Sequence, residues 1–297
     1  MITIEKFGAI DIGSNAVRLL IGSVTTLDGE QPRFKKTSLI RVPIRLGADV
    51  FLRNEVSEEN VLRLVDAMKS YKLLMRIHKV KSYRACATSA MRGANNGIEV
   101  VDRVQREADI QIDIIDGKDE ASIISMTDLA ELTDQEKSYL YVDVGGGSTE
   151  FTVYDHGDRV ASRSFDLGTV RLLNDLVTND LWKEVEFWIK EQTKDFDNIS
   201  LIGSGGNINN IFKNSAVDKG TPLTYMYLSS YYQLLKSLTY EERIWELNMN
   251  SDRADVVVPA TKIFLSAMKW SNAQNIYVPK IGLADGIIKF LYSETLK

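Results

Sequence analysis

The chain is poor in the residues that build disulfide-linked or zinc-bound proteins. Its 297 residues include one cysteine, Cys86, and two histidines, His78 and His156. A single cysteine excludes an internal disulfide and fits a reducing compartment. Two histidines so far apart in the sequence are too few for a zinc site. Cys86 lies in a strand-like apolar segment, so we interpret it as a small core residue rather than a nucleophile.

The sequence also has no segment that indicates export or membrane insertion. The N-terminus lacks the basic flank and apolar core of a signal peptide, and no apolar run approaches the length of a membrane span. Positive charge is not in excess, because the formal net charge is −5, and this argues against a general nucleic-acid binder. We therefore expect a cytoplasmic protein with neither a membrane nor a nucleic acid as its partner.

The most informative stretch that is present is YLYVDVGGGSTE at residues 139–150. A β-prone run ends in Gly145-Gly146-Gly147, whose bare backbone N–H groups can form a concave anion site. Asp143 precedes this loop and Glu150 follows it. Two carboxylates beside a phosphate site repel the ligand unless a cation stands between them, which suggests Mg²⁺. The alternative is a glycine-rich hairpin turn with a solvated Asp and Glu, and this stretch alone favours neither.

The same plan recurs near the N-terminus. The segment FGAIDIGSN at residues 7–15 has an apolar run, Asp11, Gly13 and Ser14, and Asp11 lies 132 residues before Asp143. We interpret the two segments as a duplicated strand–loop–strand unit, with one copy in each half. A third loop, LIGSGGN at residues 201–207, follows a short apolar strand and leads into a helix. Three such loops favour phosphate binding over unrelated turns.

The remainder alternates between strand-like and helix-like segments, and its length suffices for two domains. We expect three strands within 7–47, and further strands at 83–88, 110–115, 139–144, 149–154, 158–166 and 276–278. We expect helices at 57–78, 98–108, from 116 to about Leu129, and at 169–176, 180–194, 208–213, 229–238, 241–247, 254–270 and 284–292.

Basic side chains gather between residues 7 and 47, and we interpret most of them as a solvated strand edge: Arg33, Lys35, Lys36, Arg41 and Arg45. Arg18 differs because it lies just beyond the first loop. Thr88, Ser89 and Arg92 follow a strand, at the end where α/β folds bind ligands. Glu120, in the first turn of an expected helix, can simply complement the helix dipole, so its spacing assigns it no role.

These motifs, in this order, resemble the exopolyphosphatase/guanosine pentaphosphate phosphohydrolase (Ppx/GppA) family, within the actin–Hsp70–sugar-kinase superfamily. The resemblance spans nearly the whole chain, and the length fits the short, two-domain form. The matching segments are AIDIGSN (9–15), ACATSAMRGANN (85–96), IIDGKDEA (114–121), VDVGGGSTE (142–150), DLGTVRL (166–172), GSGGNI (203–208) and DRADVVVPA (252–260).

The resemblance implies an α/β fold of two ribonuclease H-like domains, as in the actin-like ATPase superfamily, with the active site in the cleft between the domains. It places the first domain at residues 1–125 with a returning C-terminal helix at 284–297, and the second at residues 126–283. No low-complexity linker separates the halves, so we expect a tight hinge near residues 120–130.

The resemblance also implies roles for individual residues. Glu120, which would activate the attacking water, and Glu150 are the implied catalytic residues. Asp143, Asp11 and again Glu150 are the implied ligands of Mg²⁺ or another divalent cation. The implied phosphate-binding residues are Gly13, Ser14, Asn15, Gly145, Gly146, Gly147, Ser148, Thr149, Gly205 and Gly206. Further substrate contacts are expected from Arg18, Thr88, Ser89 and Arg92.

Two segments depart from the family pattern. Asn207 takes the place of the usual Thr in the third loop, and its amide still offers hydrogen bonds. The segment LADG at residues 283–286 replaces the usual Leu-Arg-Glu-Gly. This change removes an arginine and shortens an acid, so we assign that segment no ligand role.

The expected function is hydrolysis of a terminal phosphoanhydride, either of inorganic polyphosphate (an exopolyphosphatase) or at the 5′-phosphate of pppGpp (a guanosine-5′-triphosphate,3′-diphosphate pyrophosphatase). The alternative is a catalytically weak regulatory protein that binds (p)ppGpp or polyphosphate, and the joint presence of Glu120, Asp143 and Glu150 disfavours it. A kinase of the same superfamily is disfavoured because no adenosine-pocket motif is evident. The family often dimerises, so a homodimer is expected by analogy only.

Overall fold

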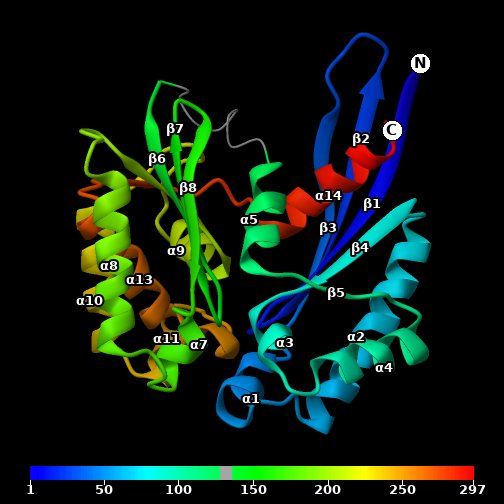
Figure 1. Ribbon diagram of the computed structural model, residues 1–297, viewed down its shortest axis with the longest axis horizontal. Helices are drawn as coiled ribbons and strands as arrows, with labels where there is room; N and C mark the ends of the chain where they lie inside the picture. The colour runs from blue at the N-terminus through cyan, green and yellow to red at the C-terminus, as the bar shows by residue number, and fades with distance from the viewer. Residues whose placement is uncertain (128–135) are drawn as a thin grey trace. The chain divides into compact units, whose positions relative to one another are not determined.

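The computed structural model describes residues 1–127 and 136–297 (Figure 1). The chain folds as two compact units, one made of residues 1–127 and 282–297 and the other of residues 128–281. The hinge expected near 120–130 and the helix expected to reach Leu129 therefore extend in part beyond the described residues. Within the described ranges, no helix combines the length and apolar character that crossing a membrane would require.

The first unit is built on a five-stranded sheet with the order β3-β2-β1-β4-β5. Strands β1 (Ile2–Ile12), β2 (Val17–Leu27) and β3 (Arg33–Val42) form an antiparallel meander. Strands β4 (Ser82–Ala87) and β5 (Asp113–Ile114) continue the sheet parallel to β1. The strand expected at 110–115 is thus only two residues long, because β5 pairs only with the end of β4.

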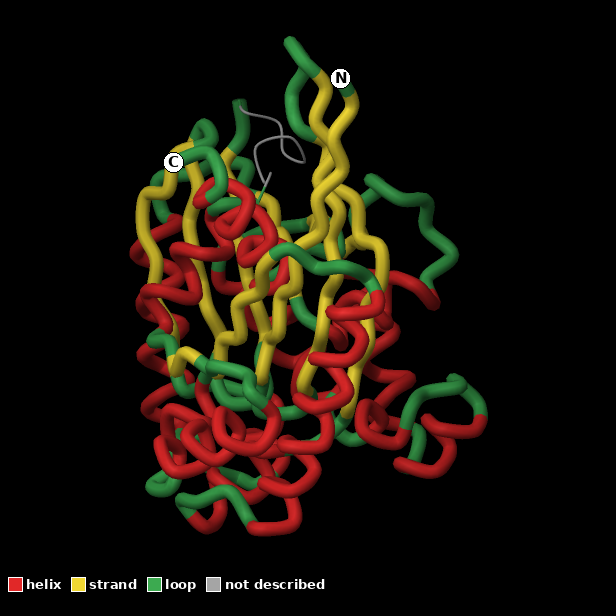
Figure 2. Tube along the Cα trace, turned by 90° about the vertical axis from the view of Figure 1, so that its right-hand side faces the viewer, coloured by secondary structure: helices red, strands yellow, loops and turns green. Residues whose placement is uncertain are grey.

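Helices cover both faces of this sheet (Figures 1 and 2). On one face, α2 (Glu58–Ile77) and α4 (Gly97–Ala108) share a core with alternate residues of β1, β2 and β4. On the other face lies α14 (Leu283–Glu294), whose Ile288 packs on Gly22 and whose Tyr292 meets Phe7 edge to face. Helix α5 (Gly117–Ser125) packs against α14.

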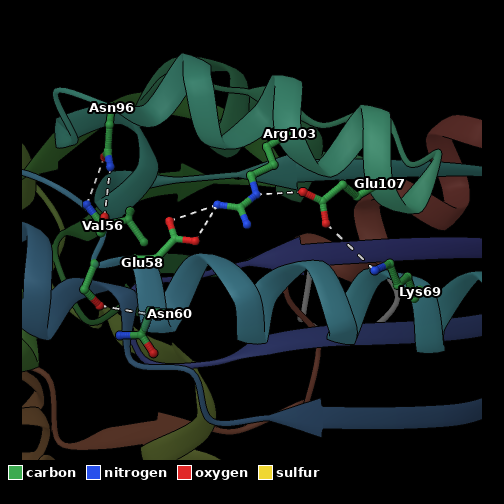
Figure 3. A network of polar contacts seen from close by, with 8 residues as sticks. Val56, Glu58, Asn60, Lys69, Asn96, Arg103 and Glu107 are labelled. Carbon is green, nitrogen blue, oxygen red and sulfur yellow. Dashed lines mark hydrogen bonds and ion pairs between the residues drawn. The ribbon is translucent and has the colours of Figure 1, made fainter.

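Helices α2 and α4 are joined by a polar network on their outer side (Figure 3). The Arg103 guanidinium of α4 bonds both Glu58 of α2, at 2.7 Å, and Glu107, at 2.7 Å. The Asn96 amide both donates to and accepts from the backbone of Val56, each at 2.9 Å. Such exposed ion pairs contribute about 0–1 kcal/mol each, so the buried apolar face of α2 holds the pair together.

The second unit repeats this plan with the order β10-β11-β9-β6-β7-β8. Strands β6 (Ser138–Val144), β7 (Thr149–Asp155) and β8 (Asp158–Phe165) form the antiparallel meander. Strands β9 (Ser200–Ser204) and β11 (Asn275–Tyr277) run parallel to β6, and the short β10 (Leu223–Thr224) closes the edge. A meander followed by parallel strands in both units is the ribonuclease H-like arrangement, and the expected fold class is confirmed.

Seven helices are described in the second unit, and α8 and α13 pack on one face of its sheet. They are α7 (Thr169–Leu173), α8 (Asn179–Thr193), α9 (Gly206–Asn214), α10 (Tyr225–Ser237), α11 (Tyr240–Trp245), α12 (Ser251–Ala254) and α13 (Val257–Trp270). The helix expected over 254–270 is α13, which begins at Val257, three residues later than expected, because the preceding short helix α12 ends at Ala254. Pro259 lies in the first turn of α13, where its missing N–H costs nothing.

Two short helices of the first unit, α1 (Leu46–Arg53) and α3 (Ser89–Gly93), were not predicted. Helix α1 begins after Arg45, which has a φ of 63° in the left-handed region. Non-glycine residues are uncommon in that conformation, so no local signal marks this helix start. Both helices start next to the first glycine loop: Gly47 at the start of α1 bonds Ser14, and Thr88, just before α3, bonds Ile12.

Candidate functional site

The glycine loop of the second unit joins β6 to β7, and α7 lies at the same end of these strands (Figure 1). The turn is closed by the Gly145 N–H, which donates to the Ser148 carbonyl at 3.0 Å. Helix α7 donates to the next carbonyls: Thr169 N to Gly145 O at 3.0 Å, Val170 N to Gly146 O at 2.8 Å and Arg171 Nε to Gly147 O at 2.9 Å. All three glycine carbonyls are therefore turned towards α7.

The orientation of these carbonyls sets the direction of the N–H groups. In a trans peptide the C=O and the next N–H point in opposite directions, so the N–H groups of Gly146, Gly147 and Ser148 point away from α7. Within the described part of the chain, none of the three donates to a backbone carbonyl. Consecutive N–H groups directed to one side form an anion-binding concavity.

Glycine at position 168 is what lets α7 approach the loop so closely. A Cβ at Gly168 would lie 2.3 Å from the Gly146 carbonyl oxygen, which no side chain could tolerate. The segment DLGTVRL therefore contains supporting residues that were not assigned from the sequence, namely Gly168 and Arg171. The sequence signalled them only through the match of this segment to the family, which assigned neither residue a role.

The glycine loop of the first unit has the same construction. Gly13 N donates to Ala16 O at 3.1 Å and closes the turn between β1 and β2. The start of α1 then supports the loop, because Gly47 N donates to Ser14 O at 2.7 Å and Arg45 N donates to Asn15 O at 3.2 Å. The N–H groups of Asn15 and Ala16 consequently point away from α1. The unpredicted helix α1 thus does for the first loop what α7 does for the second.

The third loop lies directly beside the second. Gly205 has a φ of 108°, and a Cβ there would come within 2.8 Å of the Val144 carbonyl oxygen. Helix α9 starts at Gly206, two residues earlier than expected, so its free N-terminal N–H groups lie beside β6. The Arg253 guanidinium donates to Gly206 O at 2.5 Å. Arg253 therefore supports the third loop much as Arg171 supports the second.

The corresponding position in the first unit is the end of β4. Thr88 N donates to Ile12 O at 3.2 Å, which places Thr88 and Ser89 next to the first loop, and both residues are buried. Arg92 donates instead to Ile115 O at 2.7 Å, after β5. Thr88 and Ser89 thus lie next to the first loop. The guanidinium of Arg92 instead bonds the chain just after β5, one strand further from the loop.

Asp143 and Glu150 lie in one row across the sheet of the second unit. Asp143 of β6 is directly opposite Glu150 of β7, and Glu150 is opposite Ser164 of β8. The Glu150 carboxylate is buried and accepts from the Ser148 hydroxyl at 2.7 Å and the Ser164 hydroxyl at 2.8 Å. Its orientation is therefore fixed by two hydroxyls. The Thr149 hydroxyl, predicted to bind phosphate, donates to the Leu167 carbonyl and supports the loop.

In the equivalent row of the first unit, one acidic residue faces one basic residue instead of a second acidic residue. Arg18 is directly opposite Asp11, as Glu150 is directly opposite Asp143 in the second unit. Both residues of the second pair lie 132 positions after their counterparts in the first. The Arg18 guanidinium bonds the Asp11 carboxylate at 2.9 Å. Asp11 therefore already has a cationic partner, and its role as a metal ligand stays a prediction.

Glu120 belongs to the first turn of α5 and is buried. This helix starts at Asp116, whose carboxylate caps it by accepting from the N–H groups of Lys118 and Asp119, each at 2.8 Å. The pKa of the Cys86 thiol is raised to about 12, mainly by burial; Arg84 opposes this rise, and the charges of Asp113, Asp11 and Glu120 add to it. Glu120 is thus within electrostatic reach of the residue that neighbours Asp11 in the sheet.

The site residues fit a divalent cation by the chemistry of their donors. Mg²⁺ prefers oxygen ligands and is typically held by one or two carboxylates together with waters and substrate phosphates. Asp143 and Glu150 supply two carboxylates on one face of the sheet, beside a loop suited to phosphate. Among the described residues, no cluster of three or more acidic, histidine or cysteine side chains forms a complete metal cage. An ion here would complete its coordination with substrate and water.

Comparison with known proteins shows which family the chain belongs to. Over 219 residues the chain is 32% identical to a bifunctional 3-dehydroquinate synthase/phosphatase of Fusobacterium nucleatum, which covers 67% of this chain and 32% of that protein. It is 31% identical to exopolyphosphatase 2 of Mycobacterium tuberculosis over 60% of this chain and 56% of that protein. The chain thus matches about a third to just over half of the length of these relatives.

Among solved structures, an exopolyphosphatase from Cytophaga hutchinsonii superposes with a TM-score of 0.85 over 98% of each chain, at 23% identity. At that identity the likeness establishes the fold. The sequence model of the Ppx/GppA phosphatase family matches residues 30–295, which is most of the chain. The chain therefore belongs to the Ppx/GppA phosphatase family.

Proposed function

We propose that the protein hydrolyses a terminal phosphoanhydride, releasing phosphate from the end of inorganic polyphosphate, from the 5′ end of pppGpp, or from both. The observation that carries the proposal is the support of the 145–148 loop by α7, which turns three consecutive N–H groups to one side. Phosphoryl transfer needs mainly positioning and charge neutralisation, which such a loop supplies. The names of the relatives, an exopolyphosphatase among them, support the same reaction class.

Asp143 and Glu150 would hold Mg²⁺ in this reaction. A bound Mg²⁺ would neutralise negative charge on the phosphoryl group that is transferred. The hydroxyls of Ser148 and Ser164 keep the Glu150 carboxylate in one orientation, so little reorganisation is needed when the ligand binds. The N–H groups of Gly146 to Ser148 would bind the phosphoryl oxygens, and those of Asn15 and Ala16 would bind further oxygens.

Glu120 is the proposed general base. It would accept a proton of the attacking water as the water oxygen bonds to the terminal phosphorus and the bond from that phosphorus to the bridging oxygen breaks, so that phosphate is released and the shortened chain keeps the bridging oxygen. General-base catalysis typically contributes about 10²–10⁴-fold in rate. Its place in the first turn of a capped helix keeps the carboxylate on a rigid element, which general-base catalysis requires.

The test is a substrate panel scored by released phosphate, with polyphosphates of several lengths, pppGpp and ATP, in Mg²⁺ and after chelation. We expect release from polyphosphate, pppGpp or both, slow release from ATP, and loss of activity on chelation. Glu120→Gln should lower kcat about 100-fold or more with KM nearly unchanged. The matched control is Asp119→Asn, the exposed neighbour on α5, which should keep parental kcat.

Several outcomes would contradict the proposal. Tight binding of polyphosphate or pppGpp without turnover in Mg²⁺ would make the protein a binding regulator instead of an enzyme. Parental turnover in Glu120→Gln would remove Glu120 from the base role. Preferential hydrolysis of ATP would contradict the substrate class.

A further inference from the structure

Arg171 of α7 contacts the glycine loop of the second unit through its side chain. Its Nε donates to the Gly147 carbonyl at 2.9 Å. The same guanidinium lies 3.4 Å from the carboxylate of Asp166, and the side chains of Arg171 and Asp166 are 23% and 67% exposed. An ion pair with so exposed a carboxylate contributes little. The bond to the loop is therefore the stronger of these two contacts.

The carbonyl that Arg171 binds shares its peptide unit with the Ser148 N–H. Because the peptide is planar and trans, a donor that fixes the Gly147 oxygen also fixes the direction of this N–H. The two preceding carbonyls of the loop are held by backbone N–H groups at the start of α7, which every residue except proline supplies. The Ser148 N–H is thus the loop donor whose direction depends on the identity of a side chain.

The hydroxyl of Ser148 already has another task. It is buried and donates to the Glu150 carboxylate at 2.7 Å. A serine hydroxyl has a single proton to donate, so this proton is committed to the carboxylate. What Ser148 offers an anion as a hydrogen-bond donor is therefore its backbone N–H.

The guanidinium also brings positive charge to a loop that is flanked by acids. Asp143 precedes the loop and Glu150 follows it, and both repel a phosphate group until a cation binds. A charged donor on a peptide carbonyl polarises the whole peptide unit, which makes its N–H a stronger donor. Arg171 therefore acts on the Ser148 N–H both by orienting it and by strengthening it.

A second loop of the same unit shows the same arrangement. Arg253 of α12 donates to the Gly206 carbonyl at 2.5 Å, and this carbonyl shares its peptide unit with the Asn207 N–H. That N–H lies in the first turn of α9, where backbone donors have no partner within the helix. Arginines from two helices thus act on backbone donors of the second and third loops.

We propose that Arg171 is a positioning residue for the phosphoryl group that occupies the loop at residues 145–148. Its guanidinium fixes and polarises the peptide between Gly147 and Ser148, so that the Ser148 N–H binds one oxygen of a tetrahedral phosphate. The ligand class is a single phosphoryl group, free as orthophosphate or at the end of a phosphate chain. This inference rests on the proposed use of the loop as a phosphate site, but its binding test needs no hydrolysis.

Two substitutions separate the hydrogen bond of Arg171 from its charge. Glutamine carries Nε2 at the same place along the side chain as arginine Nε, so Arg171→Gln keeps a donor and loses the charge. Arg171→Met is of similar length and has neither. On a substrate that the parent hydrolyses, kcat should fall about tenfold or more in Arg171→Met and about threefold in Arg171→Gln. KM should change less than kcat in both, because the donor serves the group that is transferred.

A readout on the loop itself distinguishes positioning from general stabilisation. In the full-length chain with isotope-labelled serine and glycine, orthophosphate in Mg²⁺ should shift the NMR amide signals of Gly146 and Ser148. In Arg171→Met the shift at Ser148 should fall by about half or more. The shift at Gly146 should remain, because the Gly145 carbonyl of its peptide is still held by the Thr169 N–H.

The matched control is Arg159→Met, the same substitution at an exposed arginine of the same unit. Arg159 is opposite Tyr154, about 20 Å along β8 from the end that borders the loop. This distance exceeds the Debye length of about 10 Å at roughly 0.1 M salt, so kcat and the Ser148 shift should stay parental. Asp166→Asn removes the ion pair but not the bond to Gly147, and kcat should stay within about twofold of the parent.

A parental kcat or a parental Ser148 shift in Arg171→Met would overturn the inference. So would an equal loss of the Gly146 and Ser148 shifts, or a loss of kcat as large in Arg159→Met or Asp166→Asn. If Arg171→Met does not fold, Arg171→Gln carries the test, and a parental kcat in that variant counts against the inference. If the Ser148 shift depends on Arg171 but the parent hydrolyses none of the panel, the proposed function fails while this inference stands.

Discussion

At the residue scale, Arg18 and Glu150 are the clearest difference between the two strand–loop–strand units. They occupy equivalent positions opposite Asp11 and Asp143. In the first unit the pair is an ion pair at 2.9 Å, whereas in the second it is two carboxylates with Glu150 held by serine hydroxyls. The side chain at this one position therefore decides whether the aspartate before the loop faces an arginine or a second carboxylate. The backbone geometry around both is the same.

Asp285 is a second residue whose environment has a measurable consequence. It lies in the first turn of α14, where it accepts from the Gly282 N–H at 3.1 Å and from Lys36 of β3. Asp285 thus caps its own helix and also bonds a neighbouring strand. Burial raises the pKa of Asp285, and this outweighs the lowering by Lys36 and the backbone.

We expect Asp285→Asn to become relatively more stable as the pH rises. A carboxyl whose pKa is raised on folding binds its proton more tightly in the folded state, so its ionisation, from near the ordinary value of 3.8 upwards, costs stability. Asparagine does not ionise and escapes this cost. Urea unfolding of both proteins between pH 4 and pH 8 would give the difference in free energy of unfolding as a function of pH.

Asp109→Asn provides the control with the opposite sign. The Lys72 ammonium holds the pKa of Asp109 below its ordinary value of 3.8, so this carboxylate contributes stability above that pH and loses it as the pH falls. The free energy of unfolding of the asparagine variant should therefore fall relative to that of the parent as the pH rises from about 2 to 5. The same direction of change in both variants would contradict the argument for Asp285.

At the scale of elements, the position of α5 depends on one glycine in α14. A Cβ at Gly286 would lie 2.1 Å from the Ile123 carbonyl oxygen, so the two helices are in backbone contact there. Ile123 is one turn beyond Glu120 in the same short helix. The C-terminal helix, last in the sequence, thus sets where the proposed base lies in the first unit.

Gly286→Ala should therefore displace α5 and reduce both stability and activity. Overpacking of this kind typically costs about 1–3 kcal/mol, and here the obstructing atoms belong to the backbone. We expect a lower melting temperature and a lower kcat, the latter through Glu120. The steric control is Gly93→Ala, where the nearest atom to a new Cβ is 3.7 Å away, and which should melt like the parent. A parental kcat in Gly286→Ala would show that α5 is held by other contacts.

The supporting helices show how far elements could be predicted. The helix expected at 57–78 was confirmed as α2, because the amphipathic pattern of this segment and its Ser57 cap are local features of the sequence. Helix α1 was missed because it begins after a left-handed arginine instead of a capping residue. The extent of β5 was overestimated because strand ends depend on the pairing partner and not on local sequence.

At the scale of the whole molecule, each unit has a hydrophobic core of its own. The chain offers a separate probe for each. All four tryptophans lie between residues 182 and 270, in the second unit, whereas the only cysteine, Cys86, is buried in the first. The raised pKa of Cys86 and its burial keep the thiol unreactive until the first unit opens.

A core substitution should therefore move only the probe of its own unit. Ile288→Ala removes the side chain that packs on Gly22 in the first unit, and such truncations cost about 2–5 kcal/mol. It should lower the urea midpoint for thiol labelling of Cys86 and leave the tryptophan fluorescence midpoint unchanged. Ile263→Ala, buried in α13 of the second unit, should do the reverse. Equal shifts of both probes in both variants would show one cooperative unfolding unit.

The sequence by itself determined the two glycine loops, the duplication and the family, because bare N–H groups after a strand are a local property that neighbouring residues suffice to specify. Only the tertiary structure decided which way those N–H groups point, since their carbonyls are turned by helices that start some 20 to 30 residues further on. The tertiary structure also placed Arg41 beside Arg18 and Gly286 against Ile123. Strand register and backbone contact join residues far apart in the chain, and no local pattern carries that information.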